Sequence, residues 1–134
     1  MTLLLDSNVL LDIFTGDPRW AEWSVEQIQP FADRPGYLFI NGVIYAEISA
    51  RAQSQKDLDS DIAGLGIRAI EPGRTALFKA GQAFAAYRDR GGPRSAILPD
   101  FIIGAHAAEL GIRLVTRDPQ RYRTYFPDLE LIAP

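Results

Sequence analysis

The sequence predicts an α/β fold in which a central, mainly parallel sheet of five strands is flanked by helices. Five short apolar runs occur along the chain, and segments with apolar residues at helical spacing separate most of them. Short apolar strands that alternate with helices form parallel sheets that are covered on both faces. The 134 residues are enough for one ordinary hydrophobic core and too few for two, so we expect a single domain over residues 1–134.

The individual elements follow from apolar runs that are bounded by turn and capping residues. The predicted strands are 2–5, 37–40, 67–70, 113–116 and 129–132. The predicted helices are 8–14, 17–28, 42–52, 56–65, 74–88 and 99–110. Asp17 followed by Pro18 is typical of a helix N-terminus, so the second helix is expected to begin there. In the last helix, Gly104 and its small neighbours allow a close approach to the sheet.

Composition and charge exclude several classes of protein. No apolar run approaches the roughly 18 residues of a membrane-spanning helix, and the first residues lack the positive segment of a signal peptide. The chain has no cysteine, which favours a reducing cytoplasm. A net charge of −3 gives no general basic character for nucleic-acid binding. Two groups of arginines precede or surround candidate acidic residues: Arg88, Arg90 and Arg94, and Arg113, Arg117, Arg121 and Arg123.

Four acidic residues are the candidate functional groups: Asp6, Glu47, Asp100 and Asp118. Asp6 directly follows one predicted strand and Asp118 lies two residues past another, and the carboxyl ends of parallel strands form the edge where sites are built. Helix capping is the alternative role of both residues, and Asp100 has the alternative of a favourable place in a first helical turn. Glu47 borders the apolar side of its helix, where a carboxylate is costly to bury. A salt bridge with Arg51, four residues later, is the alternative explanation of Glu47.

The single histidine does not join these acids in the predicted structure. His106 lies six positions after Asp100, which is roughly 240° around a helix, so its side chain points elsewhere. We interpret it as an ordinary packing or surface residue. A histidine general base is therefore not expected beside the carboxylates.

Four segments resemble, in order, the motifs of PIN-domain ribonucleases, and most of all those of VapC toxins from type II toxin–antitoxin systems. The segments are LLLDSNVLLDIF, NGVIYAEI, LPDFIIGAHA and LVTRDPQRY…FPDLELI. By this resemblance, Asp6, Glu47, Asp100 and Asp118 occupy the four acidic metal-site positions. Thr116 and Asn8 occupy the positions that support the last and the first of these acids. The segment DFIIGAHA differs from the family's commoner sequence pattern at Phe101 and His106. The PIN fold, a five-stranded parallel sheet in three layers with its helices, agrees with the strands predicted above.

The resemblance implies a metal-dependent endoribonuclease toxin that cleaves RNA by attack of water on a phosphodiester. It also implies Mg²⁺ or Mn²⁺ as cofactor, a homodimer, and neutralisation by a VapB-like antitoxin. The charges support the metal, because neighbouring carboxylates raise one another's pKa values and a divalent cation relieves this repulsion. Mg²⁺ suits a few carboxylates and retains several waters, one of which can be activated as the nucleophile.

Other classes of protein share part of this pattern. A PIN fold retained only as a binding module is one alternative, and a receiver-like Mg²⁺-binding signalling domain is another. The receiver reading needs a lysine after a late strand, but Lys56 and Lys79 are the only lysines. A phosphatase of the haloacid dehalogenase type needs a second aspartate two positions after Asp6, where Asn8 stands. Trp20, Trp23 and Phe14 either line an antitoxin groove or belong to the core.

Overall fold

A computed structural model describes residues 2–32, 34–93 and 98–134. Its centre is a five-stranded sheet in which every neighbouring pair is parallel and the strand order is β3-β2-β1-β4-β5. The strands are β1 Leu3–Leu5, β2 Leu38–Ile40, β3 Ile67–Ala69, β4 Arg113–Val115 and β5 Leu131–Ile132. The predicted α/β fold class and five strands are therefore confirmed, although each strand is shorter than its apolar run.

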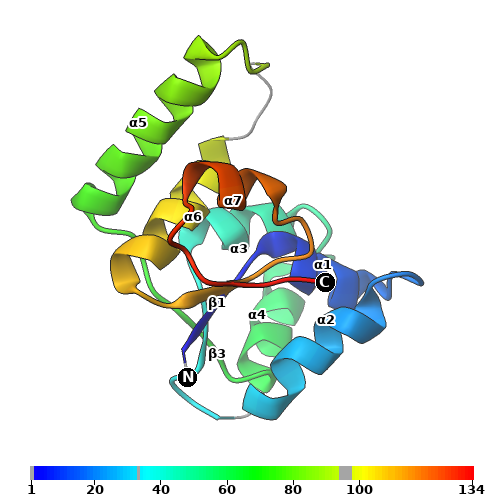
Figure 1. Cartoon of the computed structure of the whole chain (residues 1–134). Coiled ribbons are helices and arrows are strands. Elements are labelled where there is room, and N and C mark those ends of the chain that lie inside the picture. The colour runs from blue at the N-terminus through cyan, green and yellow to red at the C-terminus, as the bar shows by residue number, and fades with distance from the viewer. Residues whose placement is uncertain (1, 33, 94–97) are drawn as a thin grey trace.

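The side of the sheet on which successive strands are added changes between β3 and β4. The first three strands are added outward from β1 on one side, and β4 then pairs with β1 on the other side. Right-handed crossovers place the helices before β3 on one face and those after β3 on the other. Figure 1 shows this arrangement, with α5, α6 and α7 on the opposite side of the strands from α2 and α4. A crevice at the carboxyl ends of β1 and β4 follows from this reversal.

Seven α-helices and one short 3-10 helix are present in the described residues. Before β3 these are α1 Ser7–Thr15, α2 Ala21–Ile28, the 3-10 helix Gln29–Phe31, α3 Gly42–Ser49 and α4 Gln55–Gly64. After β3 they are α5 Arg74–Asp89, α6 Leu98–Leu110 and α7 Gln120–Tyr125. None of the helices in the described ranges is long and apolar enough to span a membrane.

Two predictions about the helices are wrong. The side chain of Asp17 accepts the backbone N–H groups of Arg19 and Trp20, so it caps a turn, and α2 begins only at Ala21. The helix α7 was not predicted at all, because its sequence QRYRTY is polar and only six residues long. Arg94, which the sequence groups with Arg88 and Arg90, lies outside the described residues.

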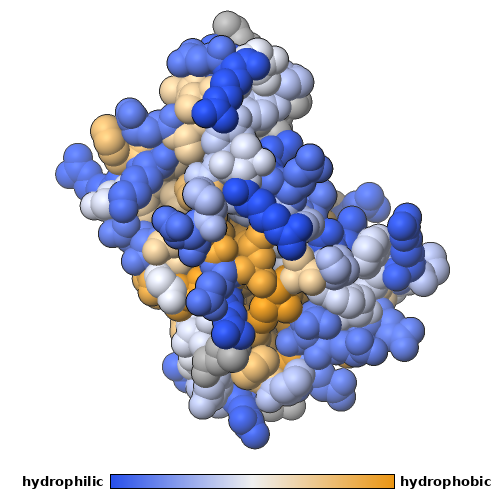
Figure 2. Space-filling model, viewed as in Figure 1, coloured by the Kyte–Doolittle hydropathy of each residue, from blue (hydrophilic) through white to orange (hydrophobic). Residues whose placement is uncertain are grey.

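The main core lies between the sheet and its helices, and it includes the wholly buried side chains of β1. In the space-filling view, apolar surface gathers in the middle of the visible face and hydrophilic residues surround it (Figure 2). A second, smaller core of aromatic and alanine side chains joins α5 to α6 around Phe101. Gly104 makes room for Phe126 and Tyr122, because a Cβ there would lie 2.6 Å from the Phe126 ring and 3.1 Å from Tyr122. The close approach that Gly104 permits is thus to α7 and the residue after it.

Candidate functional site

Asp6 is the buried centre of the site, at the carboxyl end of β1. Its Oδ1 accepts the backbone N–H of Ser7 at 2.8 Å, so the predicted cap of α1 is confirmed. Its Oδ2 accepts the hydroxyl groups of Thr116 and Tyr122, each at 2.9 Å, and the amide of Asn8 at 3.4 Å. The side chain is only 3% exposed. Asp6 is therefore held in one orientation by donors from three separate parts of the chain.

Glu47 is connected to Asp6 through Ser7. The Ser7 hydroxyl donates to Glu47 Oε1 at 2.9 Å, and it also lies 3.4 Å from Asp6 Oδ1. Among the described residues, no ion pair joins Glu47 to Arg51, so the salt bridge considered from the sequence is not formed. Burial raises the pKa of Glu47, the charge of Asp100 raises it too, and the Ser7 hydrogen bond acts in the opposite direction.

Asp100 occupies the first turn of α6, as the sequence predicted, and its carboxylate forms an ion pair with Arg121 of α7. Both side chains are about one-third exposed, at 31% and 35%. Burial and the nearby charge of Asp118 raise the pKa of Asp100, whereas the Arg121 guanidinium lowers it, and the net shift is upward. A guanidinium group thus supplies the positive charge next to this carboxylate.

Asp118 follows the carboxyl end of β4 and lies in the same region as Asp6 and Asp100. Its backbone N–H donates to Thr116 Oγ1 at 3.1 Å, and Thr116 in turn donates to Asp6. Thr116 therefore contacts both acids, and the Asn8 amide also donates to its hydroxyl group at 3.3 Å. Among the described residues, the Asp118 carboxylate accepts no hydrogen bond from the first turn of α7, so the capping role considered for Asp118 is not observed.

Three of the four predicted acids line one open pocket of about 370 Å³. The residues that line it are Asp6, Ser7, Asn8, Tyr87, Asp100, Asp118, Gln120, Arg121, Tyr122, Thr124 and Tyr125. Glu47 is not among them and reaches the pocket only through Ser7. Burial raises the pKa of Asp6 from 3.8 to about 6, and the charge of Asp100 contributes to the increase, although hydrogen bonds from Thr116, Tyr122 and Ser7 oppose it. The carboxylates therefore sit in an environment that resists their negative charge.

The donor set fits a divalent cation in chemistry and in charge. Carboxylate oxygens are the ligands that Mg²⁺ prefers, and a cation would offset the burial and the mutual repulsion that raise the pKa values of Asp6 and Asp100. The distances are not those of a finished site: within the described ranges, no three acidic or imidazole groups are assembled as metal ligands. Arg121 pairs with Asp100 in this arrangement. Holding one ion with three of these acids therefore requires side-chain movement and the release of Asp100 from Arg121.

Sequence reasoning missed three residues that organise this pocket: Ser7, Arg121 and Tyr122. Tyr122 and Arg121 belong to α7, and Gly104 provides the space that lets Tyr122 reach Asp6. Ser7 could have been recognised from its position directly after Asp6, because its hydroxyl group lies close to groups that interact with the Asp6 carboxylate. Arg121 could have been recognised because it belongs to the group of arginines around Asp118.

Arg117 belongs to the same group of arginines but has a structural role. Its Nε donates to the buried Asp12 at 2.7 Å, and its guanidinium lies 5.7 Å from the centre of the Trp20 ring. Asp12 also lies 3.4 Å from the Ser24 hydroxyl. This ion pair fastens the segment that carries Asp118 to α1 and α2.

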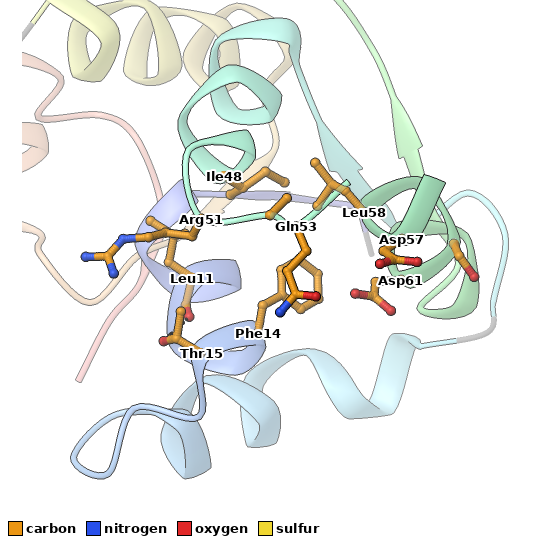
Figure 3. Close-up of a pocket in the computed structure, with 11 residues that line it drawn as sticks. Leu11, Phe14, Thr15, Ile48, Arg51, Gln53, Asp57, Leu58 and Asp61 are labelled. Carbon is orange, nitrogen blue, oxygen red and sulfur yellow. Dashed lines mark hydrogen bonds between the residues drawn. The ribbon is translucent and has the colours of Figure 1, made fainter. Parts of the chain in front are cut away.

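A second pocket, of about 390 Å³, lies between α1, α3 and α4. Phe14, Leu11 and Leu58 supply apolar side chains, whereas Asp57 and Asp61 lie at one side and Arg51 at the other (Figure 3). Phe14 thus lines a groove, while Trp23 packs against the main core. Trp20 instead lies beneath the guanidinium groups of Arg19 and Arg117.

His106 is buried and turned away from the acidic pocket, as the helical spacing predicts. Its Nδ1 lies 3.0 Å from the Asn41 amide, and burial lowers its pKa. Among the atoms that the structure describes, its Nε2 has no hydrogen-bond partner. His106 is therefore a neutral packing residue and no general base for this pocket.

The comparisons with known proteins agree with this geometry. The family model of the PIN domain matches residues 3–127, so the chain belongs to the PIN-domain family. In fold it is similar to VapBC2 from Rickettsia felis bound to a promoter DNA fragment, with a TM-score of 0.71 and 17% identity over 99% of this chain and 98% of that one. It is also similar to VapBC-1 from nontypeable Haemophilus influenzae, with a TM-score of 0.70 and 20% identity over 99% and 98% of the two chains. A toxin–antitoxin complex from Klebsiella pneumoniae gives a TM-score of 0.63 and 22% identity over 98% and 96%. No curated protein matches the sequence.

Proposed function

We propose that residues 1–134 form a single-domain, VapC-like toxin that cleaves RNA endonucleolytically with Mg²⁺ or Mn²⁺. The observation that carries this proposal is the convergence of Asp6, Asp100 and Asp118 on one pocket. These acids come from the carboxyl ends of β1 and β4 and from the first turn of α6. Membership of the PIN-domain family supports the assignment.

In this proposal Asp6, Asp100 and Asp118 hold the metal ion, and Glu47 contributes through its link to Ser7. A bound divalent cation supplies positive charge to the phosphate and lowers the pKa of a water that serves as nucleophile. Thr116 and Tyr122 hold Asp6 in one orientation, which limits the reorganisation of this carboxylate when substrate arrives. Arg121, once it leaves Asp100, is close enough to the pocket to stabilise charge on the phosphate.

The proposed partners are an RNA substrate, a second copy of the chain and a VapB-like antitoxin in the cytoplasm. The solved structures that resemble this chain include toxin–antitoxin complexes, which supports the antitoxin. The groove beside Phe14 offers apolar surface with acidic residues at one rim, a place for an antitoxin segment that carries apolar and basic side chains.

A cleavage assay tests the nuclease proposal. The purified chain is incubated with total cellular RNA in Mg²⁺, in Mn²⁺ and in EDTA, and the 5′ and 3′ ends of the products are mapped. We expect discrete cuts that require the metal and disappear in Asp100→Asn. Cuts that persist in EDTA or in this variant point to a contaminant, and no cutting in any condition favours a PIN fold retained only for binding.

A further inference from the structure

The acidic pocket has a second wall made of aromatic rings. Tyr87 of α5 and Tyr125 of α7 both line it, and their ring centres lie 5.9 Å apart with the planes at 65°. Each ring has an arginine nearby: the Arg121 guanidinium is 6.0 Å from the centre of Tyr87, and the Arg90 guanidinium is 5.7 Å from the centre of Tyr125. Aromatic surface and positive charge therefore lie together beside the carboxylates.

Packing explains only part of this arrangement. Tyr87 and Tyr125 both contact Phe101 edge-on, at 5.7 Å and 5.1 Å between ring centres, in the second core. Phe84 also packs on Phe101, at 5.9 Å between ring centres and with the planes tilted by 55°, but it does not line the pocket. The two tyrosines thus keep partly exposed surface that faces the pocket, and a purely structural cluster does not require this.

The charges around the rings indicate what class of ligand fits. The three acids of the pocket repel a phosphate, so a nucleic-acid backbone can enter only past positive groups. Arg117 is already committed to Asp12 and Trp20. Arg90 is exposed, and Arg121 is held by a partly exposed carboxylate. The side of the pocket with the two tyrosines is therefore the side on which a phosphate is least repelled.

We propose that Tyr87 and Tyr125 bind an unstacked nucleobase next to the phosphate that is cut, with Arg90 contacting a flanking phosphate. The proposal rests on the proposed nuclease function and adds to it a base-binding position formed by Tyr87 and Tyr125. Aromatic side chains stack on any base that presents its face, whereas duplex RNA keeps its bases stacked inside. The site therefore selects loops and unpaired segments, with little preference for base identity.

Fluorescence of a short single-stranded RNA that contains 2-aminopurine tests the proposal, because stacking on an aromatic ring quenches this base. The full chain carries Asp6→Asn, so that the RNA remains intact in Mg²⁺. We expect quenching on binding, and about tenfold weaker affinity with less quenching in Tyr87→Leu and in Tyr125→Leu. The corresponding Phe variants keep both properties, because they keep the ring. Phe84→Leu, in the same aromatic cluster but outside the pocket, is the matched control and leaves both unchanged.

Two further measurements separate recognition from folding. Arg90→Gln changes an exposed side chain, and it should weaken binding and reduce the slope of log affinity against log salt by about 1. A hairpin that places 2-aminopurine inside its duplex should bind at least tenfold more weakly than the single strand. Equal affinity for the hairpin, or unchanged quenching in folded Leu variants, overturns the proposal.

The outcome is independent of whether the chain is a nuclease. If the native chain does not cut RNA but quenching still depends on Tyr87 and Tyr125, the base-binding site stands and the proposed function fails. If the native chain cuts RNA and both Leu variants cut it with unchanged KM, the function stands and the base-binding site is rejected.

Discussion

Replacement of the buried Asp6 by asparagine should abolish RNA cleavage and, without metal, stabilise the protein at neutral and alkaline pH. The pKa of Asp6 is raised from 3.8 to about 6, so the folded state binds a proton more tightly than the unfolded state. This contribution to stability is complete below about pH 4 and is lost as the pH rises through 6. A shift of about 2 units corresponds to about 3 kcal/mol.

Asparagine removes this penalty but also loses part of the hydrogen bonding. The asparagine carbonyl oxygen can take the Oδ2 position and accept the Thr116 and Tyr122 hydroxyl groups. Its amide group then faces the Ser7 N–H, and the loss of this capping hydrogen bond costs about 1 kcal/mol of stability. Asp6→Asn should therefore be more stable than the native chain by about 2 kcal/mol at pH 8. At pH 4, where Asp6 is protonated, the variant should be less stable by about 1 kcal/mol.

Urea unfolding in EDTA at several pH values between 4 and 8 measures this difference. The other raised carboxyl groups affect both proteins, so the difference between the two curves isolates Asp6. Asp128→Asn removes the same charge from an exposed position and serves as the control. A difference that does not change sign with pH, or a variant less stable than the native chain at pH 8, refutes the argument from burial.

Three other predictions concern the same region. Asp100→Asn should abolish cleavage while the fold remains, and Asp118→Asn should reduce it less, as measured by initial rates; equal losses would contradict this order. Gly104→Ala should destabilise the chain by about 1–3 kcal/mol in thermal unfolding, because the new Cβ would lie 2.6 Å from the Phe126 ring, and an unchanged Tm would show that α7 adapts freely. Mg²⁺ should raise the Tm of the native chain in proportion to the logarithm of its concentration and have little effect on Asp100→Asn, whereas an equal increase in both would place the ion elsewhere.

The fold could be predicted from sequence because the strands are short, mainly apolar runs that alternate with helices. Leu3, Leu4 and Leu5 are fully buried, as a central parallel strand requires. The strand order could not be predicted in this way, because it depends on which apolar surfaces meet in space. Predicted and observed helix boundaries differ where a polar side chain can accept the backbone N–H groups of a turn as well as those of a helix, as Asp17 does.

The candidate site was predictable in its acids and not in the groups that orient them. Asp6, Asp100 and Asp118 stand directly after strands or in a first helical turn, which sequence patterns reveal. Tyr122 contacts Asp6 across 116 positions, and nothing local to either residue indicates that contact. The alternative pairing of Glu47 with Arg51 followed from helical spacing, but in the structure Glu47 accepts the Ser7 hydroxyl of another helix.

The pairing of β1 with β4 has a consequence for the timing of biosynthesis. Hydrogen bonds that orient Asp6 come from Thr116 and Tyr122, 110 and 116 positions later in the chain. A ribosome must therefore synthesise nearly the whole sequence before this carboxylate has its partners, and contacts of such long sequence separation also form slowly. Under the proposed nuclease function, a nascent chain could cut the RNA around it only once synthesis is almost complete.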